Sequence, residues 1–416
     1  MPIPLLNRLL RLLRVLRVLR GRSGLAATAT AAATAVVLVA APMAAAQTPP
    51  PPRASRPCGT HDAVRRSLHR LVVHDRIAGA AVLADGAGAD AGCARWTATD
   101  GVADLRSGRP MNTTDRLRVG SVTKTFTATV ILQLAAERRL LLDAPVERYV
   151  PGLIRGHGYD GRRITVRQLL QHTSGLPDHL DAPAWDHPEP LRYRHFTPRE
   201  LIADALRLPR PRQTWHYSTT NYLVAGLIVR AVTGRSPESE ITRRVIAPLG
   251  LHDTYWPGDD ARLHGPHSHS YFTTDDGRRA DGTSWNMTFG GVGGALVSTP
   301  ADLIRFGTAL FGGRLLPTAE LADMRRTVAA GPDRLWPGAR YGLGLISSPL
   351  SCGGTWWGHA GTVPGGHRAL VAVGPGGRSI AVALNGIPAT LQAERDFLDV
   401  VDTAFCEALP SERTSA

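Results

Sequence analysis

Lysine is almost absent from this chain of 416 residues. Lys124 is the only lysine, against 47 arginines. Arginine stays protonated in proteins, whereas a lysine amine can lose its proton when it is desolvated. We therefore expect Lys124 to do something that arginine cannot do, such as accepting a proton in a reaction.

Several other protein classes are excluded by what the composition lacks. Only one stretch is long and apolar enough to cross a bilayer, so a polytopic membrane protein is excluded. Hydrophobic residues make up 43% and charged residues 20%, which excludes wholesale disorder and a coiled coil. The 43 glycines and 31 prolines indicate many turns and argue against an all-helical bundle.

The basic charge is concentrated at the N-terminus. The net charge of the chain is +13, but six arginines and no acidic residue lie within residues 1–46. The rest has 42 basic and 35 acidic residues, a net charge of +7. It contains no dense basic run with interleaved aromatics, so no nucleic-acid partner is expected. A mildly basic exterior favours contact with an anionic cell wall.

The first 46 residues have the composition of an export signal. Residues 1–23 are basic, residues 24–46 are nearly all small or apolar, and three alanines precede Gln47. This pattern is typical of a cleaved signal peptide; a retained membrane anchor is the alternative. We expect a secreted protein in which the Pro-rich residues 47–57 link the export segment to the folded body.

Four cysteines in an exported chain predict two disulfides. Three pairings are possible, and the pairing of sequence neighbours is favoured: Cys58 with Cys93, and Cys352 with Cys406. No cysteine lies in a CxxC pair, which argues against zinc and dithiol chemistry.

Apolar patterning predicts strands at both ends of the body and helices in the middle. We expect helices over 60–76, 121–141 and 390–406, and strands over 78–83, 94–104, 342–346, 367–373 and 379–385. This order suggests a sheet domain, residues 58–118 and 286–408, with a helical domain inserted at 119–285 and a tail at 409–416.

Ser121 and Lys124 form the strongest candidate site. They are three residues apart at the start of a predicted helix, so the hydroxyl and the amine share one face. The positive end of the helix dipole repels a lysine there and lowers its pKa, which a general base requires. Gly120 permits close approach of a substrate to the helix start.

Two further motifs follow along the chain. Tyr217 and Thr219 lie in residues 215–222, and we expect a phenol near a cationic lysine to have a lowered pKa and to relay protons. His359 and Gly361 lie in residues 356–366, where a glycine on a strand edge lets a substrate backbone come alongside. Taken alone, these motifs also fit a buried aromatic pair before a helix and a glycine-rich hairpin.

Together and in this order, the three motifs resemble those of the serine β-lactamase and penicillin-recognising D,D-peptidase family. The likeness is greatest to the class C β-lactamase and Streptomyces-type D-alanyl-D-alanine carboxypeptidase branch, with Tyr-x-Asn second and His-x-Gly third. It spans roughly residues 60–406, and further stretches support it: 118–124, 168–176, 290–303 and 341–345.

The resemblance implies a fold and roles for the site residues. The fold is α+β, with a five-stranded antiparallel sheet flanked by helices and the site in the crevice beside a helical domain. Ser121 is the acylated nucleophile, Lys124 its base, and Tyr217 the proton shuttle to the leaving group. The backbone N–H groups of Ser121 and Thr362 form the oxyanion hole, and His359 replaces the family lysine that keeps the site electropositive.

The resemblance also bears on cofactors and disulfides. The family reaction needs no metal or organic cofactor, and a Cys352–Cys406 disulfide fits the carboxypeptidase branch. His264, His267 and His269 cluster in a loop, but no acidic or cysteine partner has metal-ligand spacing, so a polar surface loop is the better interpretation.

The chain departs from the family pattern at several positions. Thr219 stands where the motif has Asn, and Ala360 where Thr is frequent. Ile346 and Ser347 follow 341–345, where carboxypeptidase relatives can place an arginine for the substrate carboxylate. The acylation residues are intact, but these departures weaken the expectation that a peptide C-terminus is recognised. We further expect Trp285 to line the cleft, and we expect a bracing role for His172, which lies in a loop.

The sequence therefore predicts an exported, monomeric serine hydrolase that acts through an acyl-enzyme. The favoured activity is that of a D-alanyl-D-alanine carboxypeptidase on cell-wall peptides, and a β-lactamase or an esterase of the same family is the alternative. From a different class, the chain could be a catalytically silent penicillin-binding or wall-sensing module.

Overall fold

The structure is a computed structural model that describes residues 60–86, 95–274, 276–331 and 334–407. The predicted export segment, the linker, Cys58, Cys93 and the predicted tail lie outside these residues. Within the described part of the chain, no helix has both the length and the apolarity that crossing a bilayer requires.

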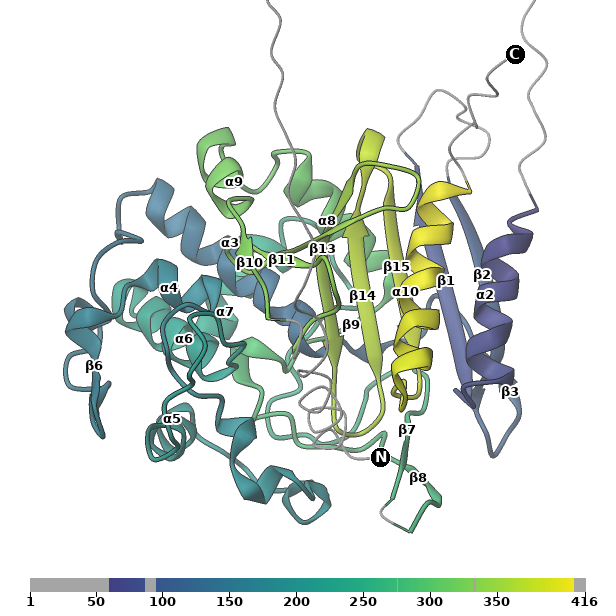
Figure 1. Ribbon diagram of the computed structural model, residues 1–416, viewed down its shortest axis with the longest axis horizontal. Coiled ribbons are helices and arrows are strands. Elements are labelled where there is room, and N and C mark those ends of the chain that lie inside the picture. Colours follow the sequence, from purple (N-terminus) through teal and green to yellow (C-terminus); the bar gives the residue numbers. More distant parts are fainter. Residues whose placement is uncertain (1–59, 87–94, 275, 332–333, 408–416) are drawn as a thin grey trace, which may run out of the picture.

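A large antiparallel sheet forms the centre of the fold (Figure 1). Its five long strands are neighbours in space: β13 (Thr355–Thr362), β14 (Arg368–Val373), β15 (Ser379–Leu384), β1 (Gly79–Asp85) and β2 (Arg95–Asp104). Shorter strands extend the sheet on both sides: β12 (Ile346–Pro349), β11 (Arg340–Tyr341) and β10 (Val328–Ala329) beside β13, and β3 (Arg109–Pro110) beside β2.

The antiparallel α+β class is confirmed, but the expected five strands are too few. Nine strands of the described residues belong to the sheet. The additional ones have only two to four residues, too short to show an alternating pattern in sequence. The strand expected over 342–346 is instead mostly a turn, in which the Gly342 N–H bonds the Leu345 carbonyl at 2.8 Å.

Both faces of the sheet are covered. Along β15, Ile380, Val382 and Leu384 point into one apolar cluster, and Ala381 and Ala383 into the other. On the first face, α2 (Asp62–Val73) packs beside α10 (Leu391–Cys406), as the purple and yellow helices of Figure 1 show. On the other face, α8 (Pro300–Phe311) packs against β14 and β15. Two-sided burial explains why β1, β14 and β15 are apolar at nearly every position.

The middle of the chain is mainly helical. Its helices are α3 (Thr123–Ala136), α4 (Val166–Gln171), α5 (Pro198–Leu206), α6 (Thr220–Thr233) and α7 (Pro237–Ile241), and α9 (Thr318–Met324) follows α8. The first ten residues of α3 are all buried, because the helix packs against α6, α7 and β13. Short strand pairs lie outside the large sheet: β4 (Leu117–Arg118) with β9 (Val297–Ser298), β5 (Arg155–Gly156) with β6 (Tyr159–Asp160), and β7 (Tyr271–Thr273) with β8 (Arg279–Asp281).

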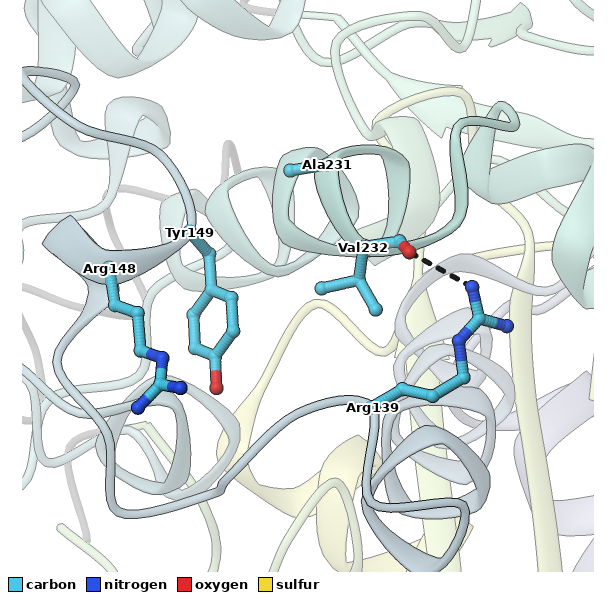
Figure 2. Close-up of a pocket in the computed structure, with 5 residues that line it drawn as sticks. All are labelled: Arg139, Arg148, Tyr149, Ala231 and Val232. Atoms are coloured by element: carbon cyan, nitrogen blue, oxygen red, sulfur yellow. Dashed lines mark hydrogen bonds between the residues drawn. The ribbon is translucent and has the colours of Figure 1, made fainter.

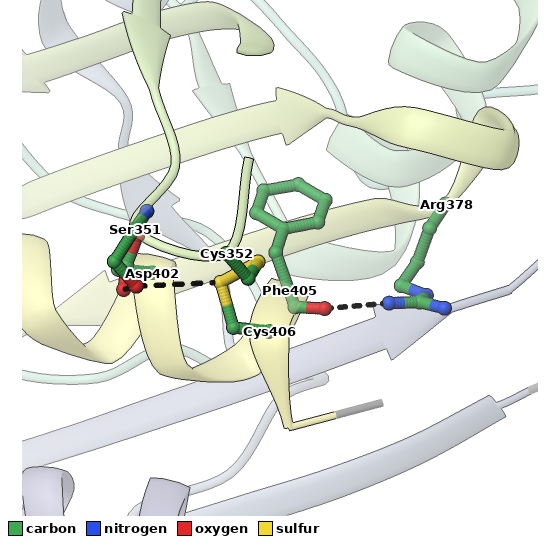
Figure 3. The surroundings of a disulfide bond; sticks show 6 residues. All are labelled: Ser351, Cys352, Arg378, Asp402, Phe405 and Cys406. Atoms are coloured by element: carbon green, nitrogen blue, oxygen red, sulfur yellow. Dashed lines mark hydrogen bonds between the residues drawn. A yellow bond between two sulfur atoms is a disulfide. The ribbon is translucent and has the colours of Figure 1, made fainter. Parts of the chain in front are cut away.

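One of the two expected disulfides can be assessed, and it is confirmed. Cys352 and Cys406 are bonded with a Cα–Cα distance of 5.6 Å, so the turn between β12 and β13 is joined to the last residue of α10 (Figure 3). A neighbouring hydrogen bond from the Ser351 N–H to the Asp402 carboxylate, at 2.8 Å, fastens the same two segments. The expected Cys58–Cys93 bond lies outside the described residues.

Candidate active site

Two glycines bring the start of α3 against strand β13. Gly120 has φ of +52°, and a Cβ there would lie 2.8 Å from the backbone N and O of Thr362. A Cβ on Gly361 would lie 2.0 Å from the Val119 carbonyl oxygen and 2.6 Å from the Ser121 nitrogen. Neither position therefore accepts a side chain. The close approach sets the backbone of Ser121 beside that of Gly361 and Thr362.

Ser121 and Lys124 meet as their spacing predicts. Ser121 lies in a single 3₁₀ turn, Gly120–Val122, that leads directly into α3. The Lys124 Nζ lies 3.0 Å from the Ser121 Oγ and 2.8 Å from the Gly293 carbonyl oxygen. Its third neighbour is the Thr219 Oγ1, at 3.3 Å. The amine is thus surrounded by neutral oxygens.

Lys124 is fully buried, with an exposed fraction of 0%. Burial lowers the pKa of its amine from 10.5 to about 7, although the charge of Asp178 acts in the opposite direction. Desolvation disfavours the charged ammonium, so the neutral amine is populated near pH 7. This is the property that the sequence analysis expects of the single lysine.

Tyr217 lies against the same two residues. Its phenol is close enough to Ser121 for that hydroxyl to influence the phenol pKa, and its ring centre lies 4.9 Å from the Lys124 Nζ. The expectation of a lowered phenol pKa is wrong, because burial raises the pKa of Tyr217 well above its usual value. Burial is the largest cause of this shift, and the hydrogen-bonding influence of Ser121 does not offset it.

Thr219, at the residue before α6, has its hydroxyl beside the Lys124 amine. Thr219 stands where the family motif has Asn, and it offers only one hydroxyl to a substrate. In the structure that hydroxyl is engaged by Lys124. The next turn of α6 carries Tyr222, whose ring centre lies 5.5 Å from the Lys124 Nζ and whose hydroxyl donates to the Leu170 carbonyl.

His359 does not make the site electropositive, so this expectation is wrong. Its ring is 1% exposed, and burial followed by the charge of Lys124 lowers its pKa to about 3. The Nδ1–H donates to the Ala360 carbonyl at 2.6 Å, and the Nε2 accepts from the Tyr341 hydroxyl at 2.9 Å. This neutral ring is a structural neighbour of Tyr341 and Tyr217, with no free nitrogen for a substrate anion.

Trp285 is also placed differently from the expectation. Its side chain is 1% exposed and packs edge-on against Phe272 with ring centres 6.2 Å apart. The backbone N–H of Trp285 donates to the Ala261 carbonyl at 2.7 Å. Since almost none of the side chain is accessible, Trp285 belongs to the core and does not line a cleft.

The three loop histidines have separate partners. His264 pairs with Asp260 at 3.1 Å and His269 with Asp281 at 2.8 Å, while His267 bonds the Gly265 carbonyl at 2.7 Å. Over the part of the chain that the structure describes, no group of three or more His, Cys, Asp or Glu side chains is arranged to hold a metal ion.

The sequence analysis missed two groups and gave a third only a bracing role. The Gly293 carbonyl bonds Lys124, and Tyr341 bonds His359; both lie in stretches, 290–303 and 341–345, that carry the resemblance but had no assigned role. His172 lies at the end of α4 and contacts the segment that carries Tyr217, so the expected bracing role is borne out.

One hollow of the described residues lies away from these side chains. It has a volume of about 410 Å³ and is lined by Arg139, Arg148, Tyr149, Ala231 and Val232. Figure 2 shows Arg139 reaching the Val232 carbonyl, a bond of 2.9 Å. None of these side chains belongs to the Ser121 cluster, and no charged group there is deeply buried. This hollow is therefore not part of the Ser121 site.

Comparison with known proteins places this geometry in a family. The family model described as Beta-lactamase matches residues 63–399. Penicillin-binding protein 4 of Amycolatopsis lactamdurans is 30% identical over 302 residues, which is 70% of this chain and 77% of the relative.

Similar solved structures support the same family. A D-stereospecific amidohydrolase from Streptomyces sp. is 38% identical with a TM-score of 0.74, and the match covers 84% of this chain and 100% of that one. A D-amino acid amidase from Ochrobactrum anthropi SV3, complexed with L-phenylalanine amide, is 26% identical with a TM-score of 0.70, over 83% and 98% of the two chains. The chain therefore belongs to the Beta-lactamase family of serine hydrolases, which includes the penicillin-recognising proteins.

Proposed function

We propose that the protein hydrolyses an amide bond of a D-configured acyl group through an acyl-enzyme on Ser121. The Ser121 hydroxyl gives its proton to the Lys124 amine as its oxygen attacks the carbonyl carbon. The tetrahedral intermediate then collapses, the C–N bond breaks, and the leaving nitrogen takes a proton from the site. Water attacks the resulting ester, which releases the acid and restores the serine.

The observation that carries this proposal is the environment of the Lys124 amine. A neutral amine has two N–H donors and one lone pair. The Gly293 carbonyl and the Thr219 hydroxyl can accept the two donors, which leaves the lone pair for the Ser121 hydroxyl at 3.0 Å. Burial keeps the pKa of the amine at about 7, close to the pH at which a general base works best.

Tyr217 is proposed to pass the proton onward. Its phenol lies near Ser121, and its raised pKa keeps the hydroxyl protonated. A neutral hydroxyl can accept a proton on one side while it releases its own on the other, so it suits a relay to the leaving nitrogen. The developing oxyanion is proposed to lie between the backbone N–H groups of Ser121 and Thr362, which the glycine contact holds close together.

The charges around the site favour a neutral leaving group. His359 is buried and uncharged, and Ile346 and Ser347, where relatives can place an arginine, are buried. A peptide with a free terminal carboxylate needs a cation at this end, whereas a simple amide or ester does not. The similarity to a D-stereospecific amidohydrolase and to a D-amino acid amidase supports the same substrate class, a D-aminoacyl amide.

A D-alanyl-D-alanine carboxypeptidase activity is the second candidate. The 30% identity to penicillin-binding protein 4 over 77% of that relative favours it, and a β-lactam would acylate the same serine. A catalytically silent module is disfavoured, because such a module has no need of a nucleophile, a buried amine and a phenol in mutual contact. Export is proposed on the composition of residues 1–46, and the Cys352–Cys406 bond supports an oxidising compartment.

One substrate panel tests the proposal. The purified protein and its Ser121→Ala variant are incubated with a D-aminoacyl amide, a D-Ala-D-Ala peptide and a penicillin, with amine release and intact mass recorded. We expect amide turnover and a penicillin adduct only when Ser121 is present. Turnover of the peptide in place of the amide would favour the carboxypeptidase. The absence of both turnover and adduct would refute acyl-enzyme chemistry.

A further inference from the structure

His172 contacts the segment around Tyr217 on both sides of the tyrosine. The backbone N–H of His216 donates to the His172 carbonyl at 2.9 Å, and the backbone N–H of Ser218 donates to the His172 Nδ1 at 3.2 Å. The residues before and after Tyr217 are therefore fixed to the same histidine. Nothing in the proposed chemistry uses His172, although it is completely buried.

The imidazole also contacts the phenol ring itself. The ring centres of His172 and Tyr217 lie 4.3 Å apart at an angle of 36°. On another side, the His172 ring lies 4.7 Å from that of Tyr341, the residue that bonds His359. The Tyr217 ring thus contacts both the histidine and the Lys124 amine, which lies 4.9 Å from its centre.

The state of the imidazole is determined by its hydrogen bonds. Its Nδ1 accepts a second hydrogen bond, from the Asn221 side-chain amide, at 3.1 Å. The Ser174 hydroxyl donates to the Asn221 Oδ1 at 2.6 Å and fixes the orientation of that amide. An Nδ1 that accepts two hydrogen bonds carries no proton, so the proton lies on Nε2. The Nε2 is buried and has no partner among the described residues, which gives the ring no route for proton exchange with a substrate.

The backbone of His172 adds a constraint of its own. With φ of 62° and ψ of 30°, the residue ends α4 in the left-handed conformation. Among residues other than glycine this conformation is uncommon, and Asn, Asp and His adopt it more often than the rest. Histidine and asparagine both suit this backbone, so the conformation does not by itself require the imidazole.

We propose that His172 is a positioning residue that holds the Tyr217 phenol over Ser121. The inference rests on the proposed function for its kinetic consequence, but the placement of the phenol can be measured without activity. Two variants separate the contribution of the imidazole ring from that of its Nδ1 acceptor. His172→Asn keeps an acceptor near Nδ1 and suits the left-handed backbone, but it removes the ring. His172→Phe keeps a ring and removes the acceptor.

The kinetic test is a double-mutant cycle with Tyr217→Phe. We expect His172→Asn to lower kcat about 100-fold with little change in KM, the effect of a displacement of about 1 Å at a reacting group. In the Tyr217→Phe background the same change should cost less than about 3-fold. His179→Asn is the matched control, because His179 is equally buried but bonds Thr220 and the Phe289 carbonyl; its effect should be the same in both backgrounds.

Equal losses for His172→Asn in the two backgrounds, or no loss in either, would overturn the inference. A crystal structure of each soluble His172 variant provides the second measurement. We expect the Tyr217 hydroxyl to have moved away from Ser121, and a phenol in its original place would also overturn the inference. If the wild-type protein shows neither turnover nor adduct, the proposed reaction fails, but the crystal structures still decide the positioning.

Discussion

The rate of Ser121 acylation should follow the fraction of molecules in which the Lys124 amine is neutral. With a pKa of about 7, the amine is neutral in about a tenth of molecules at pH 6 and in about three quarters at pH 7.5. At its ordinary pKa it would be neutral in only about one molecule in a thousand at pH 7.5. The shift corresponds to about 5 kcal/mol of differential solvation, which comes from complete burial without an acidic hydrogen-bond partner.

The pH profile can be assigned because the neighbouring groups titrate elsewhere. Burial lowers the pKa of His359 to about 3 and the pKa of His172 well below its usual value. Burial raises the pKa of Tyr217 far above neutrality. Of these buried groups only Lys124 has a pKa near 7, so we expect an ionisation near pH 7 in the acylation rate to belong to it.

The assay is the second-order rate of penicillin or ester acylation, followed by stopped flow between pH 5 and pH 9. We expect the rate to rise about tenfold per pH unit below 7 and to level off above about pH 8. Lys124→Arg keeps the positive charge but cannot supply a neutral base, so it should lower the rate at least about 1,000-fold at every pH. A flat profile, a midpoint near pH 10, or an arginine variant with a tenth of the wild-type rate would refute the reasoning.

Three further predictions concern single groups. Tyr217→Phe should lower acylation about 100-fold with an unchanged thermal midpoint; a variant with wild-type rates would remove the phenol from the relay. Lys124→Met should be inactive yet about 2 kcal/mol more stable at pH 6 in urea unfolding. That advantage should shrink from pH 7 to pH 10. In this window the lysine of the unfolded wild-type chain binds a proton and that of the folded chain does not, so the stability of the wild-type protein rises with pH. An advantage that grows with pH would contradict this prediction. Replacing Cys352 and Cys406 by serine should lower the free energy of unfolding by about 4 kcal/mol, as expected for closing a loop of this length; unchanged urea midpoints would show that the bond does not contribute.

The long elements and the principal pair could be predicted from sequence because local patterns encode them. Strands β1 and β15 are continuous apolar runs, and α10 has apolar residues at helical spacing. The three-residue separation of Ser121 and Lys124 puts them on one face of any helix, and the structure brings them within 3.0 Å. The antiparallel class followed from the order of strands and helices together with the family resemblance.

Local sequence patterns could not predict which polar side chains of the site are buried in the folded chain. The expected pKa direction for Tyr217 and the charge expected of His359 assumed solvated groups, whereas both rings lie among α3, α6 and β13, where desolvation dominates. Trp285 was assigned to a cleft because of its residue type, but its packing against Phe272 depends on a long-range contact. The short edge strands were missed for the same reason, since pairing partners define them.

The central claim is that the Lys124 amine is neutral near pH 7, and the composition of the chain allows it to be measured directly. Because Lys124 is the only lysine, incorporation of ¹³Cε-labelled lysine places the label at one side chain of the whole protein. An NMR titration of its ¹³Cε shift between pH 5 and pH 11 should show one transition with a midpoint at about 7, and Ser121→Ala should keep that midpoint within about one unit, because burial is its main cause. A midpoint above 10 would show that the amine is charged when Ser121 must lose its proton, and the proposed acylation would be contradicted.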